Sequence, residues 1–285
     1  MPESPVPQPS PAAPPAGRIA QRFRELAASR ELGLVVYVTA GDPSLDATRD
    51  IVEAAAKAGA DVIELGVPFS DPLADGPAIQ RASERALRAG TTLAGVIGLA
   101  ARLRERTQVP LILFSYFNPI LQMGLDKFAA DAATAGVDGA LATDLNPDEA
   151  EDYRTALRAR GLDTIFLAAP TSTDARLERI AKSSSGFVYL VSRMGVTGAR
   201  EALPEELPAL AAHVRRFTPL PLAVGFGISQ PAHMARIGAI ADAAVVGSAV
   251  VQEIERAPTA AEAAANVARL VQALKGAARK SARRI

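Results

Sequence analysis

The feature that most constrains this sequence is the alternation, from Arg18 onward, of short apolar runs with longer amphipathic stretches. The apolar runs are rich in β-branched residues and are continuously apolar, which is typical of strands in a parallel sheet covered by helices. We expect eight strands, at about 34–39, 61–65, 110–115, 138–142, 163–168, 186–191, 221–225 and 242–247. Eight strand–helix units close naturally into a barrel, so we predict a single-domain α/β fold, a (β/α)₈ barrel, over residues 18–285.

The helices between the strands carry start and stop signals. Ser44 is placed to cap the helix that follows the first strand, and Gly59 ends that helix. Pro77 stands where a first helical residue tolerates proline, and Gly90 closes the helix. The last helix repeats apolar residues at i, i+3, i+4 and i+7, namely Val267, Leu270, Val271 and Leu274.

An open doubly wound sheet is the alternative fold. It would more often show a Gly-x-Gly-x-x-Gly turn after its first strand, whereas residues 39–44 read TAGDPS. The TIM barrel is therefore favoured. In such barrels the chemistry lies on the loops after the strands, so the acidic, proline-rich stretch ELGVPFSDPLADGP (64–77) falls at the active face.

The overall composition excludes several classes of function. Lys plus Arg and Asp plus Glu number 31 each, so no net field attracts nucleic acid or an anionic membrane. The absence of cysteine excludes disulfides and thiol nucleophiles. No apolar run reaches the roughly 18 residues that a membrane-spanning helix needs.

The amino-terminal segment differs from the rest of the chain. Residues 1–17 read MPESPVPQPSPAAPPAG, and we expect a disordered, polyproline-like tail because the prolines deny it regular hydrogen bonding. An SH3-type ligand is the alternative. The segment lacks the basic start and apolar stretch of a secretory signal, so we expect a cytoplasmic protein.

Glycines mark the ends of the last two expected strands, in VGFGIS (224–229) and VVGSAV (245–250). Barrels often bind phosphate with the loops after strands seven and eight, where glycine lets backbone N–H groups approach the anion. Gly225, Gly227 and Gly247 could instead only make tight turns. Because Ser248 stands beside Gly247 and neither run carries lysine, we predict a site for a phosphate monoester.

Three carboxylates belong to the strand-two block. Glu64 closes the strand between Ile63 and Leu65, and an acid among apolar neighbours should have a raised pKa that suits proton transfer. The alternative is that Glu64 pairs with an arginine inside the barrel. Asp75 is the second candidate, with a helix cap as its alternative, and Asp71 is expected to organise its own loop.

Missing residue types narrow the reaction further. No expected strand end carries a lysine, so a Schiff-base aldolase lacks its amine. His213 and His233 fall in predicted outer helices and are expected at the surface. Because the chain has no cysteine and shows no cluster of histidines with carboxylates, we do not expect a catalytic transition metal. We therefore predict metal-free acid–base chemistry on a small phosphorylated molecule, beside an aromatic wall formed by Tyr37, Phe114, Tyr116 and Tyr189.

Together these motifs resemble the α subunit of tryptophan synthase. The likeness runs from about Arg18 to the end of the chain and is carried by YVTAGDP (37–43), GADVIELGVPFSDPLADGPAIQ (59–80), SYFNPI (115–120), YLVSRMGVTGAR (189–200), VGFGIS and VVGSAV. The strand-two block is specific to that family, whereas the phosphate loops are shared with many barrels.

The resemblance implies a carbon–carbon lyase that cleaves indole-3-glycerol phosphate to indole and glyceraldehyde 3-phosphate. Glu64 matches the family's catalytic glutamate, Asp75 the aspartate that holds the indole N–H, and Tyr189 a tyrosine beside the glutamate. Thr197 and Gly198 match a mobile loop after strand six, where the threonine orients the aspartate. The phosphate cradle is matched by Gly198, Gly227, Gly247 and Ser248, and Tyr37 and Phe114 fall at positions that line the indole pocket.

The resemblance also implies a partner, a β subunit that carries pyridoxal phosphate and receives the indole through a tunnel in an α₂β₂ assembly; no cofactor is expected in this chain. Its docking surface would include the loop after strand two and the SYFNP region. One departure concerns the run after strand four, where the family commonly has Asp-Leu-Pro and this chain has Asp144-Leu145-Asn146-Pro147. The shape of that loop is therefore less certain to match.

Two other functions compete with this interpretation. A sugar-phosphate isomerase or epimerase would share the barrel and the phosphate loops, but usually places a lysine, histidine or metal at the strand mouths. A non-catalytic barrel that only activates a partner would be expected to lose Glu64 or Asp75, and both are present.

Overall fold

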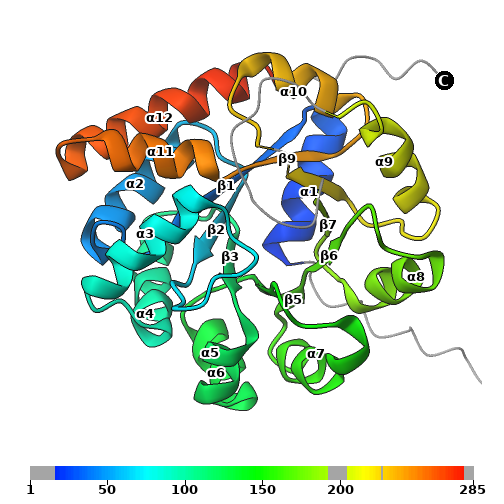
Figure 1. Ribbon diagram of the computed structural model, residues 1–285, viewed down its shortest axis with the longest axis horizontal. Helices are drawn as coiled ribbons and strands as arrows, with labels where there is room; N and C mark the ends of the chain where they lie inside the picture. Colours follow the sequence, from blue (N-terminus) through cyan, green and yellow to red (C-terminus); the bar gives the residue numbers. More distant parts are fainter. Residues whose placement is uncertain (1–16, 192–203, 226, 279–285) are drawn as a thin grey trace, which may run out of the picture.

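A computed structural model describes residues 17–191, 204–225 and 227–278. Nine parallel strand segments form a sheet in the order β5-β4-β3-β2-β1-β9-β8-β7-β6, and helices surround it (Figure 1). The strands are β1 (Gly33–Thr39), β2 (Val62–Gly66), β3 (Leu111–Ser115), β4 (Gly139–Ala142), β5 (Asp163–Thr164), β6 (Phe166–Ala168), β7 (Val188–Val191), β8 (Leu222–Gly225) and β9 (Ala243–Val246). The predicted TIM barrel is confirmed.

Helix α1 precedes β1, and the other helices follow the strands in sequence. They are α1 (Arg18–Ser29), α2 (Leu45–Lys57), α3 (Pro77–Arg88), α4 (Leu93–Arg104), α5 (Phe117–Met123), α6 (Leu125–Thr134), α7 (Glu151–Arg158), α8 (Asp174–Ser183), α9 (Leu207–Arg215), α10 (Pro231–Gly238), α11 (Ser248–Arg256) and α12 (Ala260–Gly276), with a 3₁₀ turn η1 (Pro147–Glu149). Several predicted signals are confirmed: Ser44 accepts the N–H of Ala47 at the start of α2, and Pro77 opens α3. The predicted tail, 1–17, lies outside the described residues except for Gly17.

The eight predicted strands are all found, but the fifth is divided into β5 and β6. Thr164 at the end of β5 pairs with Ala140 of β4, whereas Phe166 at the start of β6 pairs with Val188 of β7. Ile165, between the two segments, turns its side chain into the barrel interior. The fifth strand therefore changes partner at Ile165, and the sheet closes there.

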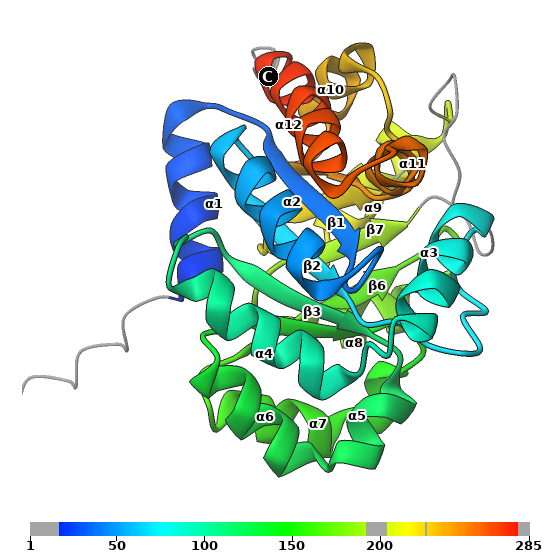
Figure 2. The same ribbon diagram turned by 90° about the vertical axis from the view of Figure 1, so that its left-hand side faces the viewer.

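Alternation along the strands separates two apolar layers. On β1, Leu34, Val36 and Val38 face the outer helices, whereas Val35 belongs to the cluster inside the barrel. The amino end of that interior is closed by α1, whose Phe23 packs its ring 5.7 Å from that of Phe187. In Figure 2, α1 lies at the left, and the loop from β2 to α3 lies at the opposite, carboxyl end of the strands.

Acidic residues at the amino end of the barrel have structural partners. Three aspartates accept a backbone N–H near the start of a neighbouring strand: Asp61 from Leu34 (2.6 Å), Asp138 from Leu111 (2.8 Å) and Asp242 from Leu222 (3.0 Å). Arg22 and Lys275 also pair with Asp61. These carboxylates hold strands together, so they are not candidates for the chemistry at the other end.

The prediction that both histidines lie at the surface is wrong for His233. Its side chain is buried with Met234 and Ile237 on the inner face of α10, and its Nδ1 accepts the N–H of Ser229 at 3.4 Å. His213 is partly exposed and pairs with Asp174 at 2.9 Å. Within the described part of the chain, no helix is both long and apolar enough to cross a membrane.

Candidate active site

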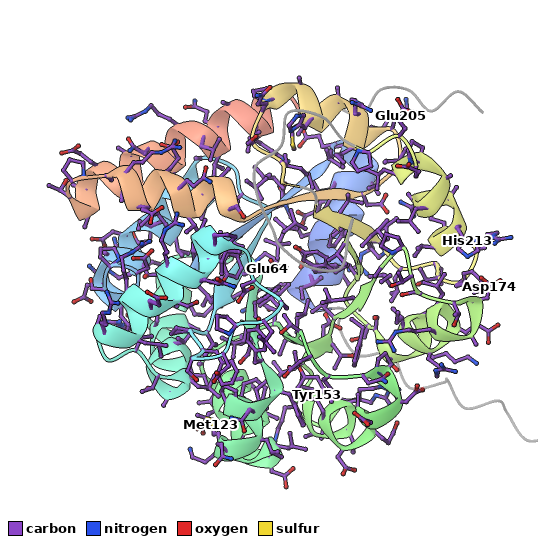
Figure 3. All side chains as sticks on the ribbon, in the orientation of Figure 1. Glu64, Met123, Tyr153, Asp174, Glu205 and His213 are labelled. Atoms are coloured by element: carbon purple, nitrogen blue, oxygen red, sulfur yellow. The ribbon has the colours of Figure 1, made fainter. Side chains whose placement is uncertain are left out.

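Glu64 is fully buried on β2, two residues after Val62, and so faces the barrel interior as Val62 does. Figure 3 places it near the centre of the barrel. Neither of its carboxyl oxygens has a hydrogen-bond partner among the described residues, so the alternative of an arginine partner is wrong for that part of the chain. Burial raises the pKa of the Glu64 carboxyl to about 8, because no donor compensates for the loss of water.

Asp75 lies on the loop between β2 and α3, and its side chain is buried. Burial raises the pKa of the Asp75 carboxyl to about 6, and a hydrogen bond from the Tyr116 hydroxyl (3.2 Å) opposes that rise. The alternative of a helix cap is wrong, because the N-cap residue of α3 is Gly76 and not Asp75. At neutral pH the site therefore holds a protonated Glu64 and an ionised Asp75.

The loop that carries Asp75 is held by its own hydrogen bonds. The N–H of Asp75 donates to the carbonyl of Pro72 (3.0 Å), and the side chain of Gln80 donates to the carbonyl of Asp75 (2.9 Å). Asp71 accepts from the Ser70 hydroxyl at 2.6 Å, in agreement with its expected role in organising the loop. The prolines and these bonds make the segment a rigid support for the buried acid.

Two tyrosines line the interior near the acids. Burial holds the pKa of the Tyr189 hydroxyl well above its usual value, and the charge of Glu64 adds to that rise; burial and Asp75 act on Tyr37 in the same way. The ring of Tyr37 meets that of Phe114 edge to face, with centroids 5.2 Å apart. Both hydroxyls therefore stay protonated and are available as donors.

Two glycines leave room for the side chains of Tyr37 and Tyr189. Sequence reasoning missed this role of the glycines. A Cβ at Gly66 would lie 2.1 Å from the Tyr37 hydroxyl, and one at Gly225 would lie 2.7 Å from the Tyr189 hydroxyl. The turn role considered for Gly225 does not apply, since it lies within β8. Gly225 instead makes space for an aromatic side chain from the neighbouring strand.

The predicted phosphate-binding residues that the structure describes lie at the carboxyl end of the strands, the same end as the loop that carries Asp75. Gly247 precedes α11 as its N-cap residue, Ser248 opens that helix, and among the described residues no side chain caps the helix start. Gly227 follows β8 with φ at +64°, a conformation that favours glycine. An uncapped helix start at a strand end offers donors and a positive dipole to an anion. Gly198, predicted for the same cradle, and Thr197, predicted to orient the aspartate, lie outside the described residues.

Strand register relates the acid to this helix start. Tyr37 of β1 pairs with Glu64 of β2 on one side, and Val36 pairs with Val246 of β9 on the other. Gly247 is therefore level with Tyr37, and the position of a Cβ on Gly247 is 3.5 Å from the Tyr37 Cβ. Two strand spacings separate the backbones of Glu64 and Gly247, roughly 10 Å. A separation of that size is comparable to the length of a small molecule.

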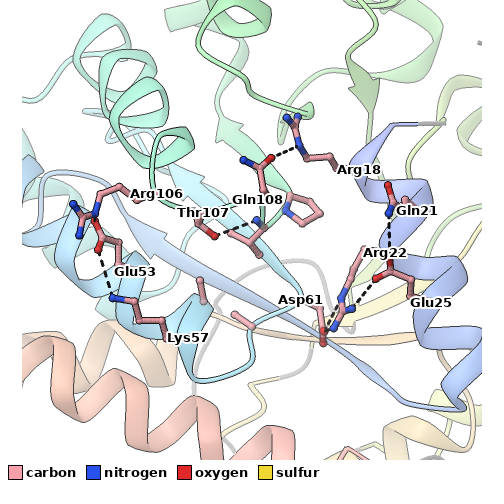
Figure 4. A pocket seen from close by; sticks show the side chains of 14 residues that line it. Arg18, Gln21, Arg22, Glu25, Glu53, Lys57, Asp61, Arg106, Thr107 and Gln108 are labelled. Atoms are coloured by element: carbon pink, nitrogen blue, oxygen red, sulfur yellow. Dashed lines mark hydrogen bonds and ion pairs between the residues drawn. The ribbon is translucent and has the colours of Figure 1, made fainter. Parts of the chain in front are cut away.

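A cavity of about 600 Å³ lies at the opposite end of the barrel, between α1, α2 and the residues before β3 (Figure 4). Its charged side chains pair with one another: Arg22 with Asp61 and Glu25, and Arg106 with Glu53. The cavity contains none of the predicted site residues. Within the described ranges, no three His, Asp or Glu side chains gather as ligands for a metal ion.

Comparison with known proteins identifies the family. The model of the family described as "Tryptophan synthase alpha chain" matches residues 23–281. Two curated relatives with that name are similar: one from Solibacter usitatus, 57% identical over 84% of this chain and 90% of its own length, and one from Geobacter sulfurreducens, 50% identical over 91% and 98%.

Solved structures agree. The tryptophan synthase subunit alpha from Legionella pneumophila is 37% identical, with a TM-score of 0.85 over 92% of this chain and 98% of that one. A Mycobacterium tuberculosis tryptophan synthase chain is 35% identical, with a TM-score of 0.87 over 94% and 100%. The chain therefore belongs to the tryptophan synthase alpha chain family, a family of lyases.

Proposed function

We propose that this chain cleaves indole-3-glycerol phosphate, by a retro-aldol step, to indole and glyceraldehyde 3-phosphate. The observation that carries the proposal is the isolation of Glu64, a buried acid without a described partner whose pKa is raised to about 8. Such a group is protonated at neutral pH and gives up its proton readily to a substrate placed against it.

The proposed reaction begins with proton transfer from Glu64 to indole carbon 3. The positive charge that develops at the indole nitrogen is stabilised by the Asp75 carboxylate, which is ionised above about pH 6. Glu64, now a carboxylate, takes the proton of the glycerol hydroxyl next to the breaking bond. As that bond breaks, its electrons return to the indole ring, the hydroxyl carbon becomes an aldehyde, and Glu64 is protonated again.

The remaining site residues are proposed to bind the two ends of the substrate. Backbone N–H groups at Gly247 and Ser248, with Gly227 and Gly198, would hold the phosphate. Thr197 would orient the Asp75 carboxylate. Tyr37 and Phe114 would form the wall against the indole ring, and the protonated hydroxyl of Tyr189 would face Glu64. The protonated ring itself accepts the bonding electrons, so the reaction calls for no Schiff-base lysine. The lysines of the described residues all lie in helices.

We further propose that the indole passes to a β subunit, with pyridoxal phosphate in that partner and none in this chain, for tryptophan biosynthesis in the cytoplasm. Two exposed apolar side chains support a docking surface at the predicted place. Leu73, on the loop after β2, is 90% exposed, and Leu121, on α5 two residues after the SYFNP run, is 53% exposed. Isolated exposed leucines are common, but these two flank the same active face.

Indole release from indole-3-glycerol phosphate tests the proposal. The purified chain should release indole, and Glu64→Gln should abolish release while substrate binding is largely kept. Glu84→Gln is the matched control, because Glu84 lies exposed on α3 in a surface ion pair with Arg88. Near-normal turnover by Glu64→Gln would contradict the role of that acid, and a native chain without activity, alone or with its β subunit, would contradict the function.

A further inference from the structure

Tyr116 connects β3 to the loop that carries Asp75. It follows β3 directly, is 5% exposed, and stacks on Phe69 with ring centroids 5.0 Å apart. Its hydroxyl contacts two consecutive residues of the β2–α3 loop. It accepts the backbone N–H of Ala74 at 2.9 Å and donates to Oδ2 of Asp75 at 3.2 Å.

The direction of the second hydrogen bond follows from the first. A backbone N–H is only a donor, so the tyrosine oxygen must accept from Ala74. The single hydroxyl proton is then free to point at Asp75, and a carboxylate is the form of that side chain that accepts it. Burial and the charge of Asp75 raise the pKa of Tyr116, so the hydroxyl keeps this proton across the working pH range.

We propose that Tyr116 is a positioning residue that holds the Asp75 carboxylate in place and favours its ionised form. In a buried site, few other groups stabilise the ionised form of Asp75. The charge of Asp75 raises the pKa of Tyr37 on β1 and of Tyr189 on β7, so these two hydroxyls lie near it. The charge of Asp144 also acts on Tyr116 and raises its pKa. Within the described residues, no arginine or lysine forms an ion pair with Asp75.

The hydrogen bond opposes the effect of burial. Burial is the larger influence and raises the pKa of Asp75 to about 6, whereas the Tyr116 hydroxyl lowers it. Without the hydroxyl, the pKa should move further up, toward neutral pH. Asp75 would then be partly protonated under the conditions in which the proposed reaction needs its negative charge.

Tyr116→Phe tests this role with little disturbance, because phenylalanine keeps the ring that stacks on Phe69. The ¹³C NMR titration of labelled aspartate in the ligand-free protein, with Asp75 assigned by Asp75→Asn, should show a pKa about one unit higher in the variant. The ionised fraction of Asp75 would then fall from about nine tenths to one half at pH 7, and from about one half to one tenth at pH 6.

Activity should follow this change in ionisation, and this readout alone rests on the proposed function. The ratio of kcat/KM for Tyr116→Phe to that of the native chain is expected to be about one half at pH 7, about one fifth at pH 6 and near one at pH 8. Tyr153→Phe is the matched control, since Tyr153 is equally buried and its hydroxyl has no described partner. It should leave the Asp75 pKa and the activity unchanged.

Two results would overturn the proposal: an unchanged Asp75 pKa in Tyr116→Phe, or a loss of activity of the same size at every pH. The NMR titration needs no substrate. If the native chain fails to cleave indole-3-glycerol phosphate, the proposed function fails, and the titration still decides whether Tyr116 controls Asp75.

Discussion

Glu64 on β2 and Tyr37 on β1 stand opposite each other in the register of the two strands, and Tyr37 separates the acid from Gly247 at the end of β9. One level of the barrel thus carries an acid, an aromatic ring and a helix start whose N-cap residue is a glycine. This order matches the proposed substrate, which has a ring to be protonated at one end and a phosphate at the other.

The isolation of Glu64 predicts a pH-dependent cost to stability. Its pKa is raised from 4.5 to about 8 in the folded chain, so the folded state holds a proton that the unfolded state releases above pH 4.5. The contribution of Glu64 is fully present below that pH and is lost as the pH rises toward 8, by about 1.4 kcal/mol per unit.

Glu64→Met should therefore be inactive and more stable than the native chain at pH 8, because an apolar side chain of similar size does not ionise. The difference in free energy of unfolding, measured with urea, should grow between pH 5 and pH 8. A variant that is less stable than the native chain at pH 8 would count against a partnerless acid at this position.

The charge of Asp75 is expected to matter more than its shape. Asp75→Asn keeps the size of the side chain but removes the negative charge opposite the developing indole cation. Preorganised electrostatic groups contribute about 3–4 kcal/mol, so kcat should fall by two to three orders of magnitude. Asp50→Asn, at an exposed ion pair on α2, is the control. Undiminished turnover by Asp75→Asn would refute the charge-stabilising role.

Gly247 should tolerate a methyl group but not a larger side chain. A Cβ there would meet Tyr37 at an ordinary contact distance of 3.5 Å, so Gly247→Ala should retain most of the affinity for the substrate. Gly247→Val should raise KM at least tenfold, because the added methyl groups crowd the donors at the start of α11. Titration calorimetry with glycerol phosphate measures the affinity of the site for the phosphate end of the substrate. An affinity in Gly247→Val equal to that of the native chain would contradict the predicted phosphate cradle.

Gly66 should not tolerate replacement even by alanine. The added Cβ would lie 2.1 Å from the Tyr37 hydroxyl, so the ring must move and both stability and turnover should fall. Gly98→Ala is the matched control in α4, where nothing lies within 4 Å of the new Cβ. That change should stabilise the chain by up to about 1 kcal/mol through helix propensity. A native-like Tm and activity in Gly66→Ala would show that Tyr37 does not need this space.

The sequence predicted the barrel because its strands are continuously apolar and its helices are punctuated by Ser44, Pro77 and glycines. It also located Glu64, since an acid between Ile63 and Leu65 in a buried strand has few polar neighbours. The partner change at Ile165 was not predictable, because a closing sheet determines it. The link between Tyr116 and Asp75 joins residues 41 positions apart and depends on how β3 lies beside the β2–α3 loop. The burial of His233 depends likewise on how α10 packs.

The protonation state of Glu64 near neutral pH is the central claim, and a ¹³C NMR titration of labelled glutamate tests it most directly, with the Glu64 signal assigned by its loss in Glu64→Gln. The expected midpoint is about 8. A midpoint near the ordinary value of 4.5 would contradict the account, because the acid would then be ionised at neutral pH and could not supply the first proton.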